Sequence, residues 1–141
     1  RSEIFAIIDE VIEEVLPKKD YNWFLNPGHL TAEEEWLSSP IHKESNEVLK
    51  SGMIFQVDII PSVKGLAGAS VESTIALANE ELKADIAKQY PELSKRFEKR
   101  REFIEKVLGI KLSKDVLVMG NALAYLRPFL LDRDLALVVE Q

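Results

Sequence analysis

The segment Gly52-Met53-Ile54-Phe55-Gln56-Val57-Asp58-Ile59-Ile60-Pro61 decides the expected fold. Its β-branched and aromatic residues predict a strand over 53–60 that ends before the proline. Because side chains alternate across a strand, Gln56 and Asp58 project from the same face. Burying a carboxylate is costly unless it is paired or bound to a cation, so Asp58 is a candidate functional residue. The alternative is an aspartate that accepts backbone hydrogen bonds or lies on a solvated face.

A second strand is predicted over 70–78, where apolar residues again alternate with polar ones. The intervening residues 61–69 contain one proline and two glycines, which indicates a hairpin-type connection. Antiparallel pairing of the two strands would place Asp58 and Glu72 on the same face of a sheet.

Apolar periodicity and end signals predict three longer helices, over 4–16, 79–89 and 91–109. Pro17 ends the first helix, Asn79 is a suitable N-cap for the second, and Pro91 and Gly109 begin and end the third. Weaker patterns predict loops and short strands over 18–52, a short helix over 113–119 and a last strand over 135–139. The expected fold class is α+β, with an antiparallel sheet backed by helices.

Composition limits the classes of function. The 141 residues carry a formal net charge of −6 and no cysteine, which argues against nucleic-acid binding and excludes disulfides and thiolate metal sites. No apolar run approaches the roughly 20 residues that span a bilayer and no signal peptide is visible, so we expect no membrane partner and a cytoplasmic location. We expect a single domain over 1–141. The chain lacks an initiator Met and becomes helical at once, so we interpret it as a fragment of a longer protein.

His29, Asp58 and Glu72 are candidate metal ligands. One imidazole and two carboxylates form a suitable donor set for a divalent transition metal. Each residue also has an ordinary explanation, because a loop histidine is commonly a surface residue and a glutamate on an exposed strand face is unremarkable. Only the convergence of the three side chains would indicate a site.

Taken in chain order, four segments of the sequence resemble the C-terminal half of the pita-bread metallopeptidase family. They are Gly28-His29, Ser39-Pro40, Gly52-Met53-x-x-Gln56-Val57-Asp58-Ile59-x-Pro61, and Glu72 before an apolar strand. This family includes methionine aminopeptidase, aminopeptidase P, prolidase and the metal-free creatinases. The resemblance covers residues 1–80 directly, and its most specific part is the strand segment around Asp58. It implies a curved antiparallel sheet backed by helices, with five ligands that hold two divalent metals such as Mn, Co or Zn. His29 then matches the histidine ligand, Asp58 stands where the family usually has Glu, and Glu72 matches the last Glu.

The implied function is the C-terminal half of a metal-dependent aminopeptidase or Xaa-Pro peptidase-like hydrolase that acts on a peptide or small amide. In that family two metals activate water and polarise the scissile carbonyl. The family's two Asp ligands come from the N-terminal half, so the missing half is the expected partner and the isolated chain is expected to be inactive. Surface that normally packs against that half is expected to drive association into a homo-oligomer.

Three departures from the family's pattern leave other functions open. Asp58 is shorter than the usual Glu, Trp36 occupies the position of a second histidine that contacts substrate, and Ser73 replaces an acid. Trp36 is a candidate for a hydrophobic substrate pocket, or else an aromatic residue packed near Pro40. The alternatives are a non-catalytic pita-bread module that binds a peptide or protein and, less favoured because Trp36 removes an acid–base histidine, a metal-free creatinase-like C–N hydrolase.

Overall fold

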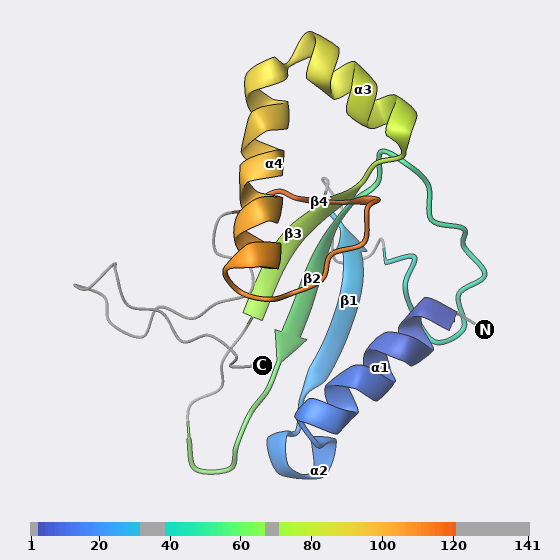
Figure 1. Ribbon diagram of the computed structural model, residues 1–141. Coiled ribbons are helices and arrows are strands. Elements are labelled where there is room, and N and C mark those ends of the chain that lie inside the picture. The colour runs from blue at the N-terminus through green and yellow to red at the C-terminus, as the bar shows by residue number, and fades with distance from the viewer. Residues whose placement is uncertain (1–2, 32–38, 67–70, 121–141) are drawn as a thin grey trace. The chain divides into compact units, whose positions relative to one another are not determined.

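The computed structural model of the protein describes residues 3–31, 39–66 and 71–120 (Figure 1). The chain divides into two compact units, Arg1–Thr74 and Ile75–Gln141. The described elements are α1 (Glu3–Val15), α2 (Lys18–Tyr21), β1 (Phe24–Leu30), β2 (Ile54–Ile60), β3 (Val71–Leu77), α3 (Glu80–Gln89), α4 (Pro91–Lys106) and β4 (Val116–Val118). Within this described part the strands are hydrogen-bonded in the order β1-β2-β3-β4. The expected α+β class with an antiparallel sheet and accompanying helices is confirmed.

The first unit is built on the antiparallel pair β1 and β2, in which Leu30 lies opposite Phe55. The register shifts within β1, because Asn26 is opposite Asp58 whereas His29 is opposite Gln56. Two residues of β1, Pro27 and Gly28, therefore face the single residue between Gln56 and Asp58, as in a β-bulge. A proline, which lacks an N–H, and a glycine interrupt a ladder readily, which explains why the bulge falls here. β1 is one of the strands expected within 18–52.

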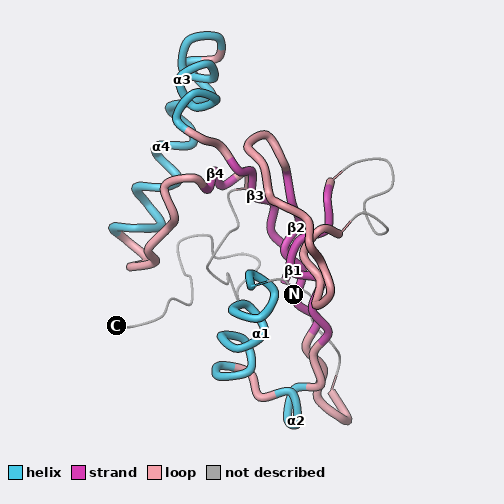
Figure 2. Tube along the Cα trace, turned by 90° about the vertical axis from the view of Figure 1, so that its right-hand side faces the viewer, coloured by secondary structure: helices cyan, strands magenta, loops and turns pink. Residues whose placement is uncertain are grey.

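Helix α1 contacts β1 in the first unit, and Trp23 links the end of this helix to the start of the strand. The Trp23 side chain is buried, and its indole Nε1–H donates to the carbonyl oxygen of Leu16 at 2.6 Å. The Lys18 ammonium lies 4.7 Å from the centroid of the indole ring. Figures 1 and 2 show α1 continuing into α2 at the end of the sheet where β1 begins. The predicted helix over 4–16 is confirmed within one residue at each end.

In the second unit, the end of β3 pairs antiparallel with β4, with Ile75 opposite Val118 and Leu77 opposite Val116. The predicted helix over 113–119 is therefore wrong. The Oγ of Ser113, the expected helix cap, instead accepts from the Asp115 N–H at 3.4 Å in a turn before the strand. Two β-branched valines suit a strand better than a helix, and the ladder with β3 satisfies the backbone groups that a helix would have satisfied internally.

Helices α3 and α4 of the second unit follow their sequence signals closely. The Leu82 N–H donates to Asn79 Oδ1 at 3.0 Å, so Asn79 is the N-cap of α3. Pro91 opens α4, and Gly109 adopts a left-handed φ of 69° beyond its end. On the inner side of α4, Ile104 packs with Leu108 and Val118.

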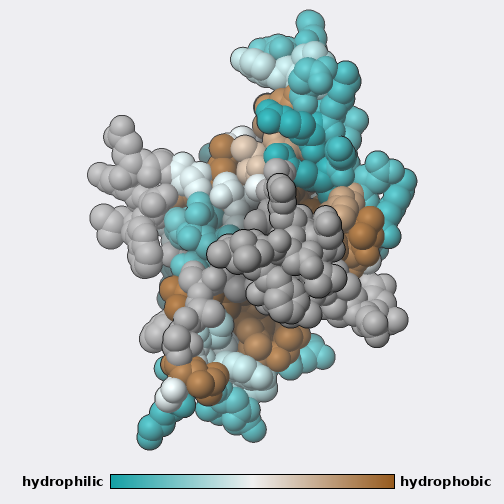
Figure 3. Space-filling model, turned by 90° about the vertical axis from the view of Figure 1, so that its left-hand side faces the viewer, coloured by the Kyte–Doolittle hydropathy of each residue, from teal (hydrophilic) through white to brown (hydrophobic). Residues whose placement is uncertain are grey.

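The outer side of α4 carries the ion pairs Lys95–Glu92 and Lys106–Glu102, whereas Arg101, which also donates to backbone carbonyls, pairs with Glu105. The uppermost part of Figure 3, where α3 and α4 meet, is correspondingly hydrophilic. The Lys106 ammonium donates to the Glu102 carboxylate and lowers the pKa of that carboxyl group. The interleaved charges are those of a solvated helix face. None of the helices in the described residues combines the length and apolarity that crossing a bilayer requires.

Replacing Trp23 by Phe tests the link between α1 and β1. Trp23→Phe removes the donor to the Leu16 carbonyl and leaves that acceptor without its indole partner, so we expect the free energy of unfolding to fall by about 2 kcal/mol. Urea denaturation followed by circular dichroism measures the loss. Lys18→Met is the matched control, because it removes only the cation above the ring and should cost less than about 1 kcal/mol. Equal losses in both variants would contradict the role of the hydrogen bond.

Replacing Asn79 tests the cap of α3. Asn79→Ala removes the side-chain acceptor for the Leu82 N–H, so we expect a loss of about 1 kcal/mol in the free energy of unfolding. Asn79→Asp keeps an acceptor oxygen and should retain most of the stability. Thermal denaturation of the three proteins distinguishes a cap from a residue that is only exposed, since an exposed residue would tolerate both changes.

Candidate functional site

One face of the first unit's strands carries the candidate residues. His29 lies opposite Gln56, and directly opposite residues project to the same face of a sheet. Asp58 follows Gln56 by two positions and shares its face. The Thr74 hydroxyl lies 3.4 Å from Gln56 Oε1, so Thr74 and, by the same alternation, Glu72 also project to this face. The arrangement agrees with the predicted common face for Asp58 and Glu72.

The bulge in β1 decides which way His29 projects. In a regular strand, residues three positions apart, such as Asn26 and His29, point to opposite faces. The extra residue in the bulge removes that opposition, so the positions of Asn26 and His29 lie opposite Asp58 and Gln56, two residues of β2 that share a face. Without the bulge, His29 would lie opposite Phe55, on the other side of the sheet.

His29 and Glu72 are brought together. The His29 side chain is buried, with 2% of its surface exposed, whereas 40% of the Glu72 side chain is exposed. His29 Nε2 lies 3.5 Å from Glu72 Oε1. Because β2 lies between β1 and β3, which are about 10 Å apart at a strand spacing of about 4.8 Å, the two side chains reach toward each other over β2.

Both ring nitrogens of His29 face oxygen acceptors. His29 Nδ1 lies 3.3 Å from the carbonyl oxygen of Leu30, which can only accept, so a proton on Nδ1 suits this contact. A proton there leaves the lone pair of Nε2 directed at the Glu72 carboxylate. A lone pair and a carboxylate repel each other unless a second proton or a cation lies between them. A neutral ring with its proton on Nε2, an imidazolium–glutamate ion pair and a shared cation all avoid that repulsion.

Asp58 is buried on β2, with 4% of its surface exposed, on the face that His29 and Glu72 share. Over the described ranges 3–31, 39–66 and 71–120, no group of three or more His, Asp or Glu side chains is gathered closely enough to hold a metal ion. The expected convergence of three ligands is thus found for two of them, His29 and Glu72. Trp36, the expected pocket residue, lies outside the described residues.

Gly28 and Ser39, which the resemblance groups with His29, also lie together. Ser39 Oγ donates to the carbonyl oxygens of Gly28 at 3.3 Å and of Ile41 at 3.4 Å. Ile41 is buried against Gly28, where an added Cβ would lie 2.5 Å from Ile41 Cδ1. A larger residue beside His29 would therefore force the end of the Ile41 side chain to move. Gln56 and Thr74 were missed as site residues because only the pairing of the strands reveals that they share a face of the sheet with His29.

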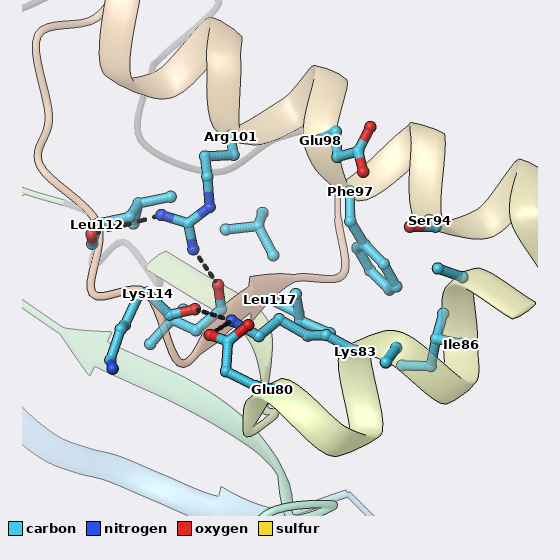
Figure 4. A pocket seen from close by; sticks show the side chains of 14 residues that line it. Glu80, Lys83, Ile86, Ser94, Phe97, Glu98, Arg101, Leu112, Lys114 and Leu117 are labelled. Carbon is cyan, nitrogen blue, oxygen red and sulfur yellow. Dashed lines mark hydrogen bonds and ion pairs between the residues drawn. The ribbon is translucent and has the colours of Figure 1, made fainter.

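The second unit contains a cavity of about 450 Å³. Figure 4 shows Phe97 of α4 and Ile86 of α3 pointing into the space between the two helices. The charged side chains Lys83 and Arg101, which line this cavity, form hydrogen bonds with other groups of the protein. Lys83 donates to the Glu80 carboxylate and lowers the pKa of that group, while Arg101 donates to the carbonyl oxygen of Val116 at 2.6 Å. Lys83 also donates to the Lys114 carbonyl oxygen at 3.1 Å, so these contacts join α3 to the segment before β4 and α4 to β4, and give the cavity a structural role.

The contact between Gly28 and Ile41 generates a prediction. Gly28→Ala adds a methyl group where Ile41 Cδ1 now lies, so we expect the free energy of unfolding to fall by about 1–3 kcal/mol. Ile41→Val removes Cδ1 and should cost about 0.5–1.5 kcal/mol alone. The double variant should lose less than the sum of the two, because the valine leaves room for the methyl group. Chemical denaturation of all four proteins measures the coupling, and strict additivity would refute the contact.

Comparison with known proteins adds no relative. No family model, curated protein or solved structure matches this sequence.

Proposed function

We propose that this chain is the C-terminal half of a metal-dependent hydrolase of the pita-bread type, related to aminopeptidases and Xaa-Pro peptidases. His29 and Glu72 would act as metal ligands, joined by Asp58 on the same sheet face. The observation that supports the proposal is the buried His29 ring, whose Nε2 faces the Glu72 carboxylate while its Nδ1 faces a backbone carbonyl. We propose, as part of the same assignment, that the antiparallel sheet is curved as in the pita-bread fold.

The donor pair fits a divalent transition metal. Metal bonds to imidazole nitrogen and carboxylate oxygen are about 2.1 Å long, so two of them span up to about 4.2 Å. The separation of 3.5 Å between Nε2 and Oε1 lies within that span. An Nδ1–H that donates to a carbonyl is the usual way in which a protein orients a metal-binding histidine. Imidazole with carboxylates suits Mn, Co or Zn better than Ca.

Asp58 would complete the set of donors that this chain supplies. Its carboxylate is buried on the strand that separates His29 from Glu72, where a nearby cation would offset its desolvation. The further carboxylates of a two-metal site would come from the partner half of the family's fold. The bound metals would polarise the scissile carbonyl of a peptide or small amide. This chain's own part is to hold and orient ligands.

A non-catalytic binding module is the second candidate. It is favoured by the absence of a three-residue metal group in the described residues. In this case His29 would carry a second proton and form an ion pair with Glu72, which would fix β1 to β3 without a metal. The same sheet face would then serve a peptide or protein partner.

Metal binding separates the two candidates. We expect the chain to bind one Mn, Co or Zn ion weakly, measured by equilibrium dialysis followed by elemental analysis. His29→Ala and Glu72→Gln should each weaken binding by at least about tenfold, because even the loss of outer partners of metal ligands has effects of that size. His42→Ala is the matched control, since His42 is exposed. An absence of binding at millimolar metal, or an equal effect of His42→Ala, would support the metal-free module instead.

A further inference from the structure

We infer that Gln56 and Thr74 are positioning residues that hold the His29 ring toward Glu72. This inference rests on the proposed metal site and deepens it. His29, Gln56 and Thr74 lie on three adjacent strands and project from the same face of the sheet. They form a polar row that we call the Gln56 row.

The Gln56 row lies beside the path along which His29 reaches Glu72. His29 is directly opposite Gln56, and Glu72 precedes Thr74 by two residues on β3. A line from His29 Nε2 to Glu72 Oε1 therefore crosses β2 on the face from which Gln56 projects. Directly opposite residues of an antiparallel pair have Cβ atoms about 5 Å apart, so the Gln56 side chain would limit the space in which the imidazole ring can turn.

The hydroxyl of Thr74 restrains those rotamers. Gln56 is half-buried, as is Thr74, and Thr74 Oγ1 donates to Gln56 Oε1 at 3.4 Å, a long hydrogen bond. A glutamine side chain has three rotatable bonds and loses up to about 2 kcal/mol of conformational entropy when it is ordered. A contact from the neighbouring strand reduces the number of states that compete with the ordered one. The Thr74 hydroxyl would thereby hold the Gln56 side chain beside the His29 ring.

Such restraint matters for a site that has few ligands. Ligand groups must be held within about 0.5 Å of their working positions, and outer partners that orient ligands are typically worth 10–100-fold in metal affinity. His29 and Glu72 belong to strands that do not pair with each other. Groups on the strand between them are placed to limit the distance that separates their side chains, and Gln56 is the residue of that strand opposite His29.

The decisive variants are Thr74→Val and Thr74→Ser. Valine has the shape of threonine without its hydroxyl, whereas serine keeps the hydroxyl. We expect Thr74→Val to weaken Co or Zn binding by about 10–100-fold and Thr74→Ser to restore most of the affinity. Gln56→Met, which keeps the length of the side chain and removes its amide, should match Thr74→Val. The double variant should lose little more, because the two residues act through one contact.

The order of the His29 ring in metal-free protein provides a second readout. Carbon-13 relaxation of labelled histidine reports ring motion, and His42 serves as an internal reference on the surface. We expect the order parameter of the His29 ring to fall in Thr74→Val and Gln56→Met and to recover in Thr74→Ser. If Thr74→Val fails to fold, Gln56→Met carries the same comparison.

The two readouts keep the inference separate from the proposed function. An unchanged ring order and metal affinity in both Thr74→Val and Gln56→Met would overturn the positioning role, even if the wild-type chain binds metal. A wild-type chain that binds no metal but shows the loss of ring order would support the positioning role and overturn the metal site. A loss of order in Thr74→Ser equal to that in Thr74→Val would also overturn the inference, because the hydroxyl would then be irrelevant.

Discussion

The register of β1 against β2 is the constraint on which the candidate site depends. It places His29 opposite Gln56 and so selects the face of the sheet on which the imidazole lies. The bulge at Pro27-Gly28 sets this register, and close packing of Gly28 against Ile41 together with the Ser39 hydroxyl holds the bulge from outside the sheet. A local backbone irregularity therefore controls the position of the buried imidazole ring of His29.

The energetics of this face differ from those of the second unit. Burial of the His29 and Asp58 side chains costs desolvation free energy, which a leucine or valine at either position would avoid. Charged groups of the second unit instead pair on an exposed helix face or donate to backbone carbonyls, where they are inexpensive. The buried acid and imidazole of the first unit therefore depend on polar or ionic contacts, of which the 3.5 Å approach of Glu72 Oε1 to His29 Nε2 is one.

Regular elements were predictable from the sequence where local signals and tertiary structure agree. The alternation over β2, the cap at Asn79 and the proline at the start of α4 all act within a few residues. The error at Val116–Val118 arose because pairing with β3 outweighs a weak helical pattern. The Gln56 row could not be predicted, since it depends on a bulge and on strand register, which are set by residues distant in the sequence. His29 and Glu72 could be nominated by type, but their 3.5 Å separation is a property of the folded sheet.

The bulge also makes the site tolerant of one change in the length of the chain. Asn26 and His29 are three residues apart on β1, whereas their partners Asp58 and Gln56 are two residues apart on β2. Loss of Pro27 would remove the extra residue, restore a regular ladder and leave the imidazole opposite Gln56. Loss of one residue from a regular part of a strand would instead turn the side chains on one side of the deletion to the other face of the sheet. A single-codon deletion can therefore preserve the facing of His29 at the bulge, where the same deletion in a regular ladder would reverse it.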